Sequence, residues 1–211
     1  MFEEIAQAVE AGKVKEIASI TQDALDQGGD PTALLDAMIS ALDTIGEKFQ
    51  VGEVFVPEML ISALTMKKAV EVLKPYLGEG ATTKNGKLII GTASGDLHEI
   101  GKNLVALMVE SAGFEVIDLG VDVPSQRFVE TLKANPDCHF VGISTLLTTT
   151  MDSMRDTIEA IIEAGLRDQV AIFVGGAPVS ATFAKTIGAD VYTSDAGAAA
   201  QKIKELARLR P

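Results

Sequence analysis

Residues 87–112 have the sequence KLIIGTASGDLHEIGKNLVALMVESA, in which an apolar strand pattern passes through a polar loop into a helix pattern. Lys87–Thr92 predicts a buried strand, and Gly101–Ala112 predicts the helix that follows it. Further strands are expected at Phe114–Leu119, His139–Ser144, Val170–Val174 and Asp190–Thr193, and further helices at Ser125–Ala134, Thr150–Ala164, Ser180–Ile187 and Ala196–Leu209. Apolar strands that alternate with helices indicate an α/β fold with a doubly wound parallel sheet.

The residues before this stretch carry helix patterns only. Apolar residues recur at helical spacing over 2–11 and 13–27, and Asp30-Pro31 is typical of the start of a third helix that runs to residue 49. Pro57 opens a fourth helix, so the sequence predicts a four-helix bundle. Residues 78–86 are polar and glycine-rich, which is typical of a linker. We therefore expect a helical domain over residues 1–83 and an α/β domain over residues 84–211.

The composition limits the cellular compartment and the kinds of binding partner that can be expected. A formal net charge of −12 argues against nucleic acid or an anionic membrane as a partner, because both are bound through clustered Lys and Arg. Cys138 is the single cysteine, so a disulfide within the chain is impossible. The sequence shows neither a signal segment nor an apolar run of membrane-spanning length. These features predict a cytoplasmic protein.

Unusual residues gather where such a sheet binds ligands. For the flavodoxin-like (Rossmann-like) strand order 2-1-3-4-5, the expected order for five strands, the ligand crevice lies at the carboxyl ends of the first and third strands. Asp96 and His98 follow the first strand, and their spacing in an extended loop points both side chains to one side. A carboxylate placed there can hold one imidazole nitrogen and leave the other free for a metal or a proton. Ser144, at the end of the third strand, is expected to add a hydroxyl to this pair.

Glycines near the strand ends fit either a bulky cofactor or tight turns. Gly91, Gly95, Gly175 and Gly176 lie there, and missing side chains leave room for a planar ring or a nucleotide tail. The turn interpretation is strong for Gly91 and weaker for the Gly175-Gly176 pair.

The same residues allow two other kinds of site, and both are disfavoured. A hydrolase triad of Ser144, His98 and Asp96 is disfavoured, because Gly142–Leu146 lacks the last glycine of a G-x-S-x-G elbow. A conventional zinc site is disfavoured because His98 is the one histidine in these loops and Cys138 lies outside them. One imidazole suffices for a metal only if a macrocycle supplies the equatorial nitrogens. A helix-capping aspartate beside a surface histidine is the plainest alternative.

The segment Asp96-Leu97-His98-Glu99-Ile100-Gly101 resembles the D-x-H-x-x-G signature of cobalamin-binding domains. Ser144-Thr145-Leu146 resembles the S-x-L segment of the same family, and Gly175-Gly176 its G-G segment. Residues 52–66 are similar to the helical cap of the corrinoid proteins of methyltransferase systems, the carriers for methanol, methylamines and aromatic methyl ethers, and to the matching modules of methionine synthase. The resemblance covers nearly the whole chain, and Glu99 stands at a variable position where members commonly carry Asp.

The resemblance implies a cofactor and a set of residues that bind it. Cobalamin is expected in the base-off, His-on form, with His98 as the lower cobalt ligand and with Asp96 and Ser144 behind it. The cofactor-binding set that we expect comprises Asp96, Leu97, His98, Glu99, Ile100, Gly101, Ser144, Leu146, Thr148, Gly175, Gly176, Thr193, Asp195, Ala196, Val56 and Met59. Ser144, Leu146 and the two glycines are expected beside the nucleotide tail, and Thr193, Asp195 and Ala196 at its far end. Val56 and Met59 are expected at the upper face of the corrin.

The resemblance also implies a function. The chain is expected to carry a methyl group between a substrate-specific methyltransferase and a second methyltransferase that acts on a thiol or a tetrahydrofolate-type acceptor. A reductive activator is expected to restore Co(I), and no turnover is expected without these partners. A cobalamin-dependent sensor is the alternative, and a mutase subunit is disfavoured by the helical cap. The sequence leaves open the methyl donor, the acceptor, the oligomeric state and the native corrinoid.

Overall fold

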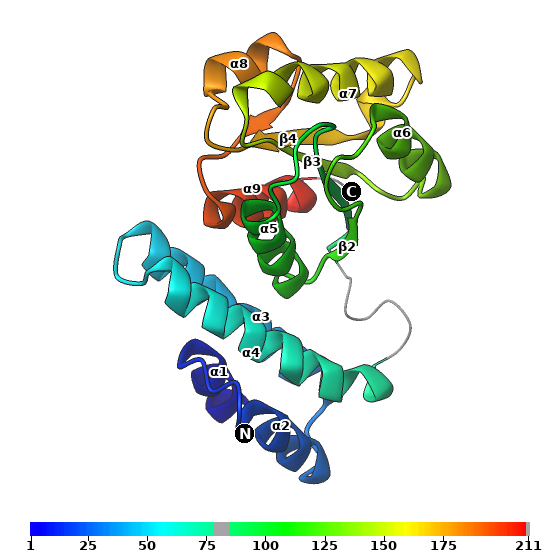
Figure 1. Ribbon diagram of the computed structural model, residues 1–211. Helices are drawn as coiled ribbons and strands as arrows, with labels where there is room; N and C mark the ends of the chain where they lie inside the picture. Colours follow the sequence, from blue (N-terminus) through cyan, green and yellow to red (C-terminus); the bar gives the residue numbers. More distant parts are fainter. Residues whose placement is uncertain (78–84, 210–211) are drawn as a thin grey trace. The chain divides into compact units, whose positions relative to one another are not determined.

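The computed structural model describes residues 1–77 and 85–209, drawn in Figure 1. The chain divides into two compact units, Met1–Asn85 with Glu110–Phe114 and Gly86–Val109 with Glu115–Pro211. The domain boundary predicted between residues 83 and 84, and most of the predicted linker 78–86, lie outside the described residues. Within residues 1–77 and 85–209, no helix is long and apolar enough to cross a membrane.

The first unit contains the four predicted helices. They are α1 (Phe2–Glu10), α2 (Ile17–Asp26), α3 (Pro31–Gln50) and α4 (Val56–Leu73), followed by the short 3-10 helix η1 (Lys74–Tyr76). The carboxylate of Asp30 accepts a hydrogen bond from the amide of Ala33 over 3.0 Å, so the predicted cap starts α3. The prediction was wrong at the start of α2, because residues 13–16 are not helical and follow Gly12, whose φ is 65°. The core of the bundle consists of Ile5, Ala8, Val9, Ile17, Ala24, Leu34, Leu35, Met38, Ala41, Met66, Ala69 and Leu73.

The second unit contains a five-stranded sheet in the order β2-β1-β3-β4-β5, as predicted. All neighbouring strands are parallel. The strands are β1 (Lys87–Thr92), β2 (Glu115–Asp118), β3 (Phe140–Ser144), β4 (Ala171–Gly175) and β5 (Val191–Tyr192). The helices between them are α5 (Ile100–Ser111), α6 (Ser125–Ala134), α7 (Met151–Glu163), α8 (Ala181–Thr186) and α9 (Ala196–Arg208), with the 3-10 helices η2 (Thr148–Thr150) and η3 (Arg167–Gln169).

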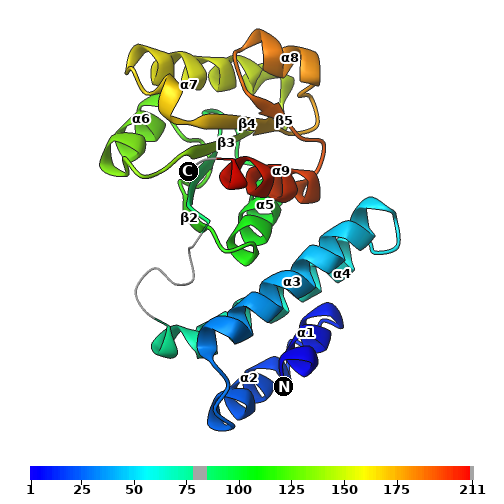
Figure 2. The same ribbon diagram turned by 180° about the vertical axis from the view of Figure 1, so that it is seen from behind.

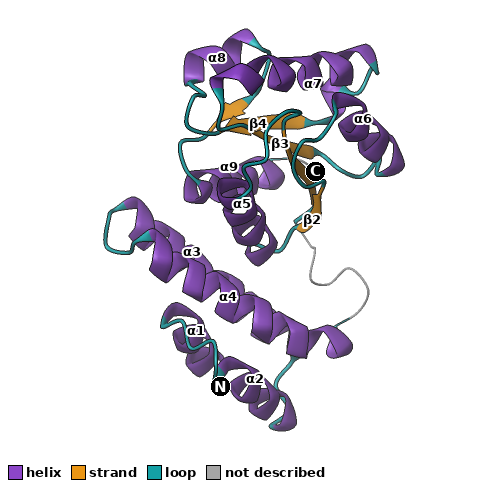
Figure 3. Cartoon of the chain, viewed as in Figure 1, coloured by secondary structure: helices purple, strands orange, loops and turns teal. Residues whose placement is uncertain are grey.

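Helices cover both faces of this sheet. Figures 1 and 2 show α6, α7 and α8 on one face and α5 and α9 on the other, and Figure 3 separates helices from strands by colour. The apolar strands are therefore buried on both sides, which is why they read as continuous apolar runs. Gly91 allows close packing of α6, because a Cβ atom there would lie 2.8 Å from the ring of Phe128. The turn interpretation of Gly91 thus gives way to a packing role.

The register of the sheet brings three strand ends together. Thr92 is the partner of Ser144, and Ser144 is the partner of Gly175. The loops after β1, β3 and β4 therefore leave the sheet side by side, at the crevice where ligands bind in this topology.

Candidate functional site

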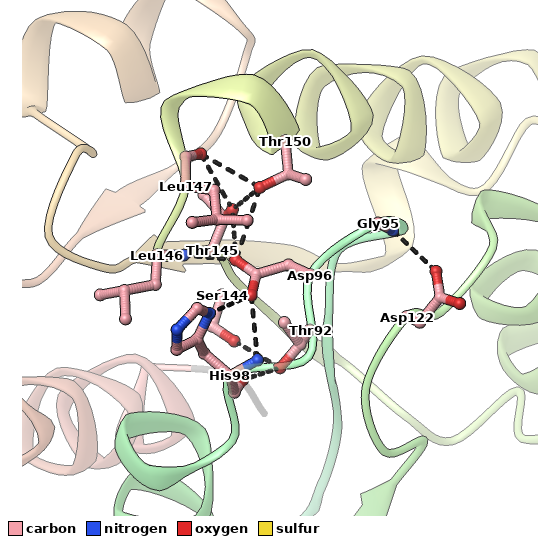
Figure 4. Close-up of polar contacts among 10 residues, drawn as sticks. All are labelled: Thr92, Gly95, Asp96, His98, Asp122, Ser144, Thr145, Leu146, Leu147 and Thr150. Carbon is pink, nitrogen blue, oxygen red and sulfur yellow. Dashed lines mark hydrogen bonds and ion pairs between the residues drawn. The ribbon is translucent and has the colours of Figure 1, made fainter.

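Asp96 and His98 form a hydrogen-bonded pair in the loop after β1, as the spacing predicted. Oδ1 of Asp96 lies 2.7 Å from Nδ1 of His98 and also accepts the His98 amide over 2.9 Å (Figure 4). The Asp96 side chain is fully buried, whereas that of His98 is 51% exposed. The pair thus joins a fixed carboxylate to an imidazole that reaches the surface.

The second oxygen of Asp96 is held by the segment that follows β3. Oδ2 accepts the hydroxyl of Thr145 over 2.9 Å and the amide of Leu146 over 2.5 Å. The hydroxyl of Thr150 lies 2.5 Å from that of Thr145 and 3.4 Å from the same carboxylate oxygen. Burial alone would raise the pKa of Asp96, but the hydrogen bonds from Leu146, His98 and Thr145 outweigh burial and hold that pKa well below its usual range. Asp96 is therefore a carboxylate at neutral pH.

The imidazole of His98 has one engaged nitrogen and one open nitrogen. The backbone oxygen of His98 accepts the hydroxyl of Thr92 over 2.9 Å, which fixes the residue at the end of the loop. Because Asp96 is ionised, Nδ1 is the nitrogen that donates a proton to it. Within residues 1–77 and 85–209, nothing hydrogen-bonds Nε2. The lone pair of Nε2 is therefore available to a metal or an acid.

The prediction that Ser144 adds its hydroxyl to Asp96 and His98 was wrong by one residue. The Ser144 hydroxyl lies 3.0 Å from that of Thr92, its partner across β1 and β3. Side chains alternate between the faces of a strand, so the next residue, Thr145, points the other way and contacts Asp96. Among the described residues, Ser144 makes no hydrogen bond to His98, so the hydrolase triad lacks its contact between nucleophile and base.

Three threonines contribute hydroxyls to the site that the sequence analysis did not predict. Thr92, Thr145 and Thr150 are 0%, 1% and 6% exposed, although each carries a hydroxyl. A buried hydroxyl needs a partner, and all three partners lie in this loop cluster. The signal that could have found Thr145 is a polar residue directly after an apolar strand, whereas Thr92 ends β1 and Thr150 ends η2.

Exposed apolar side chains lie in the two segments that form the site. Leu97 and Ile100, on the same loop, are 72% and 86% exposed, and Leu146 and Leu147 after β3 are 45% and 38% exposed. Glu99, Gly101 and Thr148 are also exposed in these two segments. Apolar residues that gather in this way are typical of a surface that binds a ligand.

The glycines at the end of β4 and directly after it are required by the protein's own packing. Gly176 has a φ of 126°, and a Cβ atom there would lie 1.7 Å from the backbone oxygen of Thr145. At Gly175, a Cβ atom would lie 3.2 Å from the backbone oxygen of Thr193. The two glycines thus let the segments after β3, β4 and β5 approach one another, and Thr193 lies beside Gly175.

The remaining predicted residues lie on helix starts. The carboxylate of Asp195 caps α9 through the amide of Ala198, at 2.8 Å, and Ala196 is buried as the first residue of that helix. In the helical unit, Val56 begins α4 and is 40% exposed, whereas Met59 is 5% exposed.

Comparisons with known proteins show the family of the chain. A family model described as a B12 binding domain matches residues 86–204, and a second model with the same description matches residues 1–74. Dimethylamine corrinoid protein 3 of Methanosarcina acetivorans is 38% identical over 206 residues, which cover 98% of this chain and 96% of that protein. Trimethylamine corrinoid protein 2 of Methanosarcina mazei is 43% identical over 89% of this chain and 87% of its own length.

Solved structures give the same relationship. A cobalamin-binding protein from Desulfitobacterium hafniense DCB-2 superposes with a TM-score of 0.79 at 31% identity, over 100% of this chain and 99% of that chain. The methanol:cobalamin methyltransferase complex of Methanosarcina barkeri contains a chain that matches with a TM-score of 0.86 at 27% identity, over 97% of this chain and 78% of that chain. The chain therefore belongs to the cobalamin-binding corrinoid proteins of methyltransferase systems.

Proposed function

We propose that this corrinoid protein binds cobalamin base-off and His-on, and that it carries a methyl group between two methyltransferases. The observation that supports this most directly is the state of His98. Its Nδ1 is held 2.7 Å from a buried carboxylate, and its ring is 51% exposed. A single oriented imidazole is a suitable axial ligand for a metal whose equatorial ligands come from a macrocycle.

The residues around His98 fit a large, flat group. Leu97, Ile100 and Leu146 offer exposed apolar side chains on the loops after β1 and β3, which also carry His98 and the segment that holds Asp96. The bound cofactor supplies a cobalt centre that accepts a methyl group and gives it up again. Glu99, Gly101 and Thr148, exposed in the same loops, are proposed to lie at its edge.

The protein's own groups orient the ligand and control its proton. Asp96 accepts the Nδ1 proton of His98, which leaves the lone pair on Nε2 and makes the imidazole a stronger donor. Thr145 and the Leu146 amide hold the other oxygen of Asp96 and keep the carboxylate ionised. The hydrogen bond from Nδ1 to a fixed carboxylate would hold the ring in one orientation while the axial ligation of a bound cobalt changes.

The nucleotide tail is proposed to lie at the carboxyl ends of β3, β4 and β5. Ser144, Leu146, Gly175 and Gly176 would border it, with Thr193, Asp195 and Ala196 at the far end. Gly176 contributes by allowing the close approach of Thr145 rather than by leaving an open space. Val56 and Met59 of α4 are proposed to cover the upper face of the corrin.

The partners follow from the carrier role. We propose a substrate-specific methyltransferase, an acceptor methyltransferase for a thiol or a tetrahydrofolate-type compound, and a reductive activator. Methylated amines are the first donors to test, because the relatives named for dimethylamine and trimethylamine are 38% and 43% identical to this chain.

The test of the proposal is reconstitution with hydroxocobalamin followed by spectroscopy. The purified chain should retain colour after desalting, and its Co(II) form should show nitrogen splitting from an axial imidazole in the electron paramagnetic resonance spectrum. His98→Ala should bind cobalamin more weakly and lose that splitting. His139→Ala is the matched control, since His139 precedes β3 at the amino end of the sheet. Because the cofactor's benzimidazole also carries a nitrogen that can bind cobalt, the splitting is assigned with protein labelled with ¹⁵N-histidine, and a splitting that the label does not change would rule out His98 as the ligand.

A further inference from the structure

Asp122 has an unusual backbone conformation in the loop after β2. Its φ is 51°, and it is the one non-glycine residue with positive φ in the described part of the chain. Glycine takes this conformation without steric cost, whereas an aspartate is tolerated there at a cost of about 1 kcal/mol. We therefore expect the Asp122 carboxylate to make hydrogen bonds that a glycine at this position could not make.

The Asp122 side chain holds the loop that carries Asp96 and His98. Oδ1 of Asp122 accepts the amide of Gly95 over 2.7 Å and the hydroxyl of Ser94 over 3.2 Å. Figure 4 shows the contact with Gly95 on the side of the loop away from Thr145. The amide of Asp122 donates to the backbone oxygen of Asp96 over 2.9 Å. One residue thus holds a backbone group before Asp96 and a backbone group of Asp96 itself.

The two loops are joined further along the chain as well. The amide of Thr92 donates to Gly120, and the amide of Val123 donates to Thr92, each over 3.0 Å. Ala93 and Val123 form an isolated parallel bridge. These backbone contacts place the loop after β2 beside the loop after β1, and they fix Asp122 within reach of Gly95.

We propose that Asp122 is a positioning residue for the Asp96–His98 pair. It fixes the backbone on which Asp96 stands, while Thr145 and Leu146 fix the carboxylate. Loss of the Asp122 carboxylate frees the Gly95 amide, so the loop samples conformations in which Asp96 no longer aligns the His98 ring. This inference rests on the proposed axial role of His98, and it assigns the support of that ligand to a residue outside the D-x-H-x-x-G segment.

The test uses two substitutions in the full-length protein. Asp122→Gly keeps the positive φ and removes the carboxylate, and Asp122→Asn keeps one acceptor oxygen and removes the charge. Asp190→Asn is the matched control, because Asp190 also accepts a backbone amide, that of Ile172 over 2.7 Å, between β4 and β5. Both asparagine variants lose one negative charge, and Asp190→Asn also loses the ion pair of Asp190 with Arg167 over 2.7 Å. An effect at Gly95 that is larger in Asp122→Asn than in Asp190→Asn therefore reports on the place of the contact.

Two measurements separate a positioning role from a general loss of stability. In the apoprotein, amide hydrogen exchange at Gly95 should be about tenfold faster in Asp122→Gly than in wild type, and raised less in Asp122→Asn. In the cobalamin-bound Co(II) protein, the share of molecules that show axial nitrogen splitting from histidine should be highest in wild type, lower in Asp122→Asn and lowest in Asp122→Gly. Asp190→Asn should lower the unfolding midpoint yet keep wild-type Gly95 exchange and wild-type splitting.

The outcomes are distinguishable. Wild-type Gly95 exchange and splitting in both Asp122 variants would overturn the inference and leave the proposed function intact. If Asp122→Gly does not fold, equal behaviour of Asp122→Asn and Asp190→Asn would overturn it instead. If the wild-type protein itself lacks nitrogen splitting, the proposed function fails, and Gly95 exchange still decides whether Asp122 holds the loop.

Discussion

The hydroxyl of Thr145 donates to Oδ2 of Asp96 over 2.9 Å, although 49 residues separate them in the sequence. The other oxygen of Asp96, Oδ1, accepts hydrogen bonds from Nδ1 and from the amide of His98. The carboxylate therefore connects the loop after β1 to the segment after β3, and its two oxygens have different tasks. One orients the imidazole, and the other anchors the pair to the end of the sheet.

The first prediction concerns this anchor. Thr145→Val removes the hydroxyl with little change in volume and leaves a buried carboxylate with one hydrogen bond fewer, so the free energy of unfolding should fall by about 1–3 kcal/mol. Ser144→Ala should cost less, about 1 kcal/mol, because the Ser144 hydroxyl contacts another hydroxyl, that of Thr92. Urea denaturation of the two apoproteins measures both values. A larger loss in Ser144→Ala than in Thr145→Val would contradict this assignment of the hydroxyls.

The second prediction concerns the glycines at the end of β4 and directly after it. Gly176→Ala places a methyl group against the backbone oxygen of Thr145 at a φ of 126°, so it should lower stability by more than about 3 kcal/mol or prevent folding. Gly175→Ala is the control, with a nearest contact of 3.2 Å to Thr193, and should cost about 1 kcal/mol. Thermal unfolding followed by circular dichroism compares them. Equal stability of the two variants would show that the backbones of Gly176 and Thr145 leave room for a Cβ atom between them.

The strands and their order could be predicted because the signals are local and repeated. Apolar runs such as Lys87–Thr92 and Phe140–Ser144 mark buried parallel strands, and the topology rule then places the site at their carboxyl ends. The pairing of Asp96 with His98 followed from a spacing of two residues. These features depend on residues that are close in sequence.

What escaped prediction depends on contacts between distant residues. Ser144 and Thr145 both carry hydroxyls at a strand end, and the register of β1 with β3 decides which of them contacts Asp96. The pattern Gly175-Gly176 fits a space for a ligand as well as a close approach of two backbones, and the structure shows the approach. The conformation of Asp122 leaves no trace in composition or periodicity.

The third prediction concerns Cys138, which is free and buried. Burial raises the pKa of the Cys138 thiol, so less of the reactive thiolate is present at a given pH. Alkylation of the native protein by iodoacetamide at pH 8 should therefore be much slower than alkylation of the unfolded chain, and it should accelerate as the pH rises. Mass spectrometry of timed samples, with guanidinium-unfolded protein as the control, measures the rates. Equal rates in the two states would contradict the burial of the thiol.

The fourth prediction concerns the two-domain organisation. A fragment from residue 84 onward should fold and bind cobalamin, because the sheet and its helices share a core of their own around Ile89, Val141 and Ile172. If α4 covers the corrin through Val56 and Met59, reduced cobalt in the fragment should oxidise faster than in the whole chain. Visible absorbance after desalting checks binding, and the decay of the Co(I) band checks protection. A fragment that unfolds would show that the helical unit is needed for the fold.

The fifth prediction concerns catalysis, and it follows from where the proton-transferring groups lie. Transfer of a methyl group from an amine or an alcohol requires the leaving group to be protonated or bound to a metal in a dedicated pocket. His98 and Asp96 are committed to each other at 2.7 Å, and in the proposed role they lie beneath the corrin, away from the face where a methyl group arrives. The reduced, cobalamin-bound protein alone should therefore show negligible methylation by trimethylamine, dimethylamine or methanol. Addition of a cognate methyltransferase should produce activity that saturates with that partner's concentration, followed as the absorbance change of the cobalt centre.

The matched control is His98→Ala with the same partner, which should retain some methylation if His98 only orients cobalt. Rapid methylation of the wild-type protein without a partner would show that the chain has a donor site of its own and is more than a carrier.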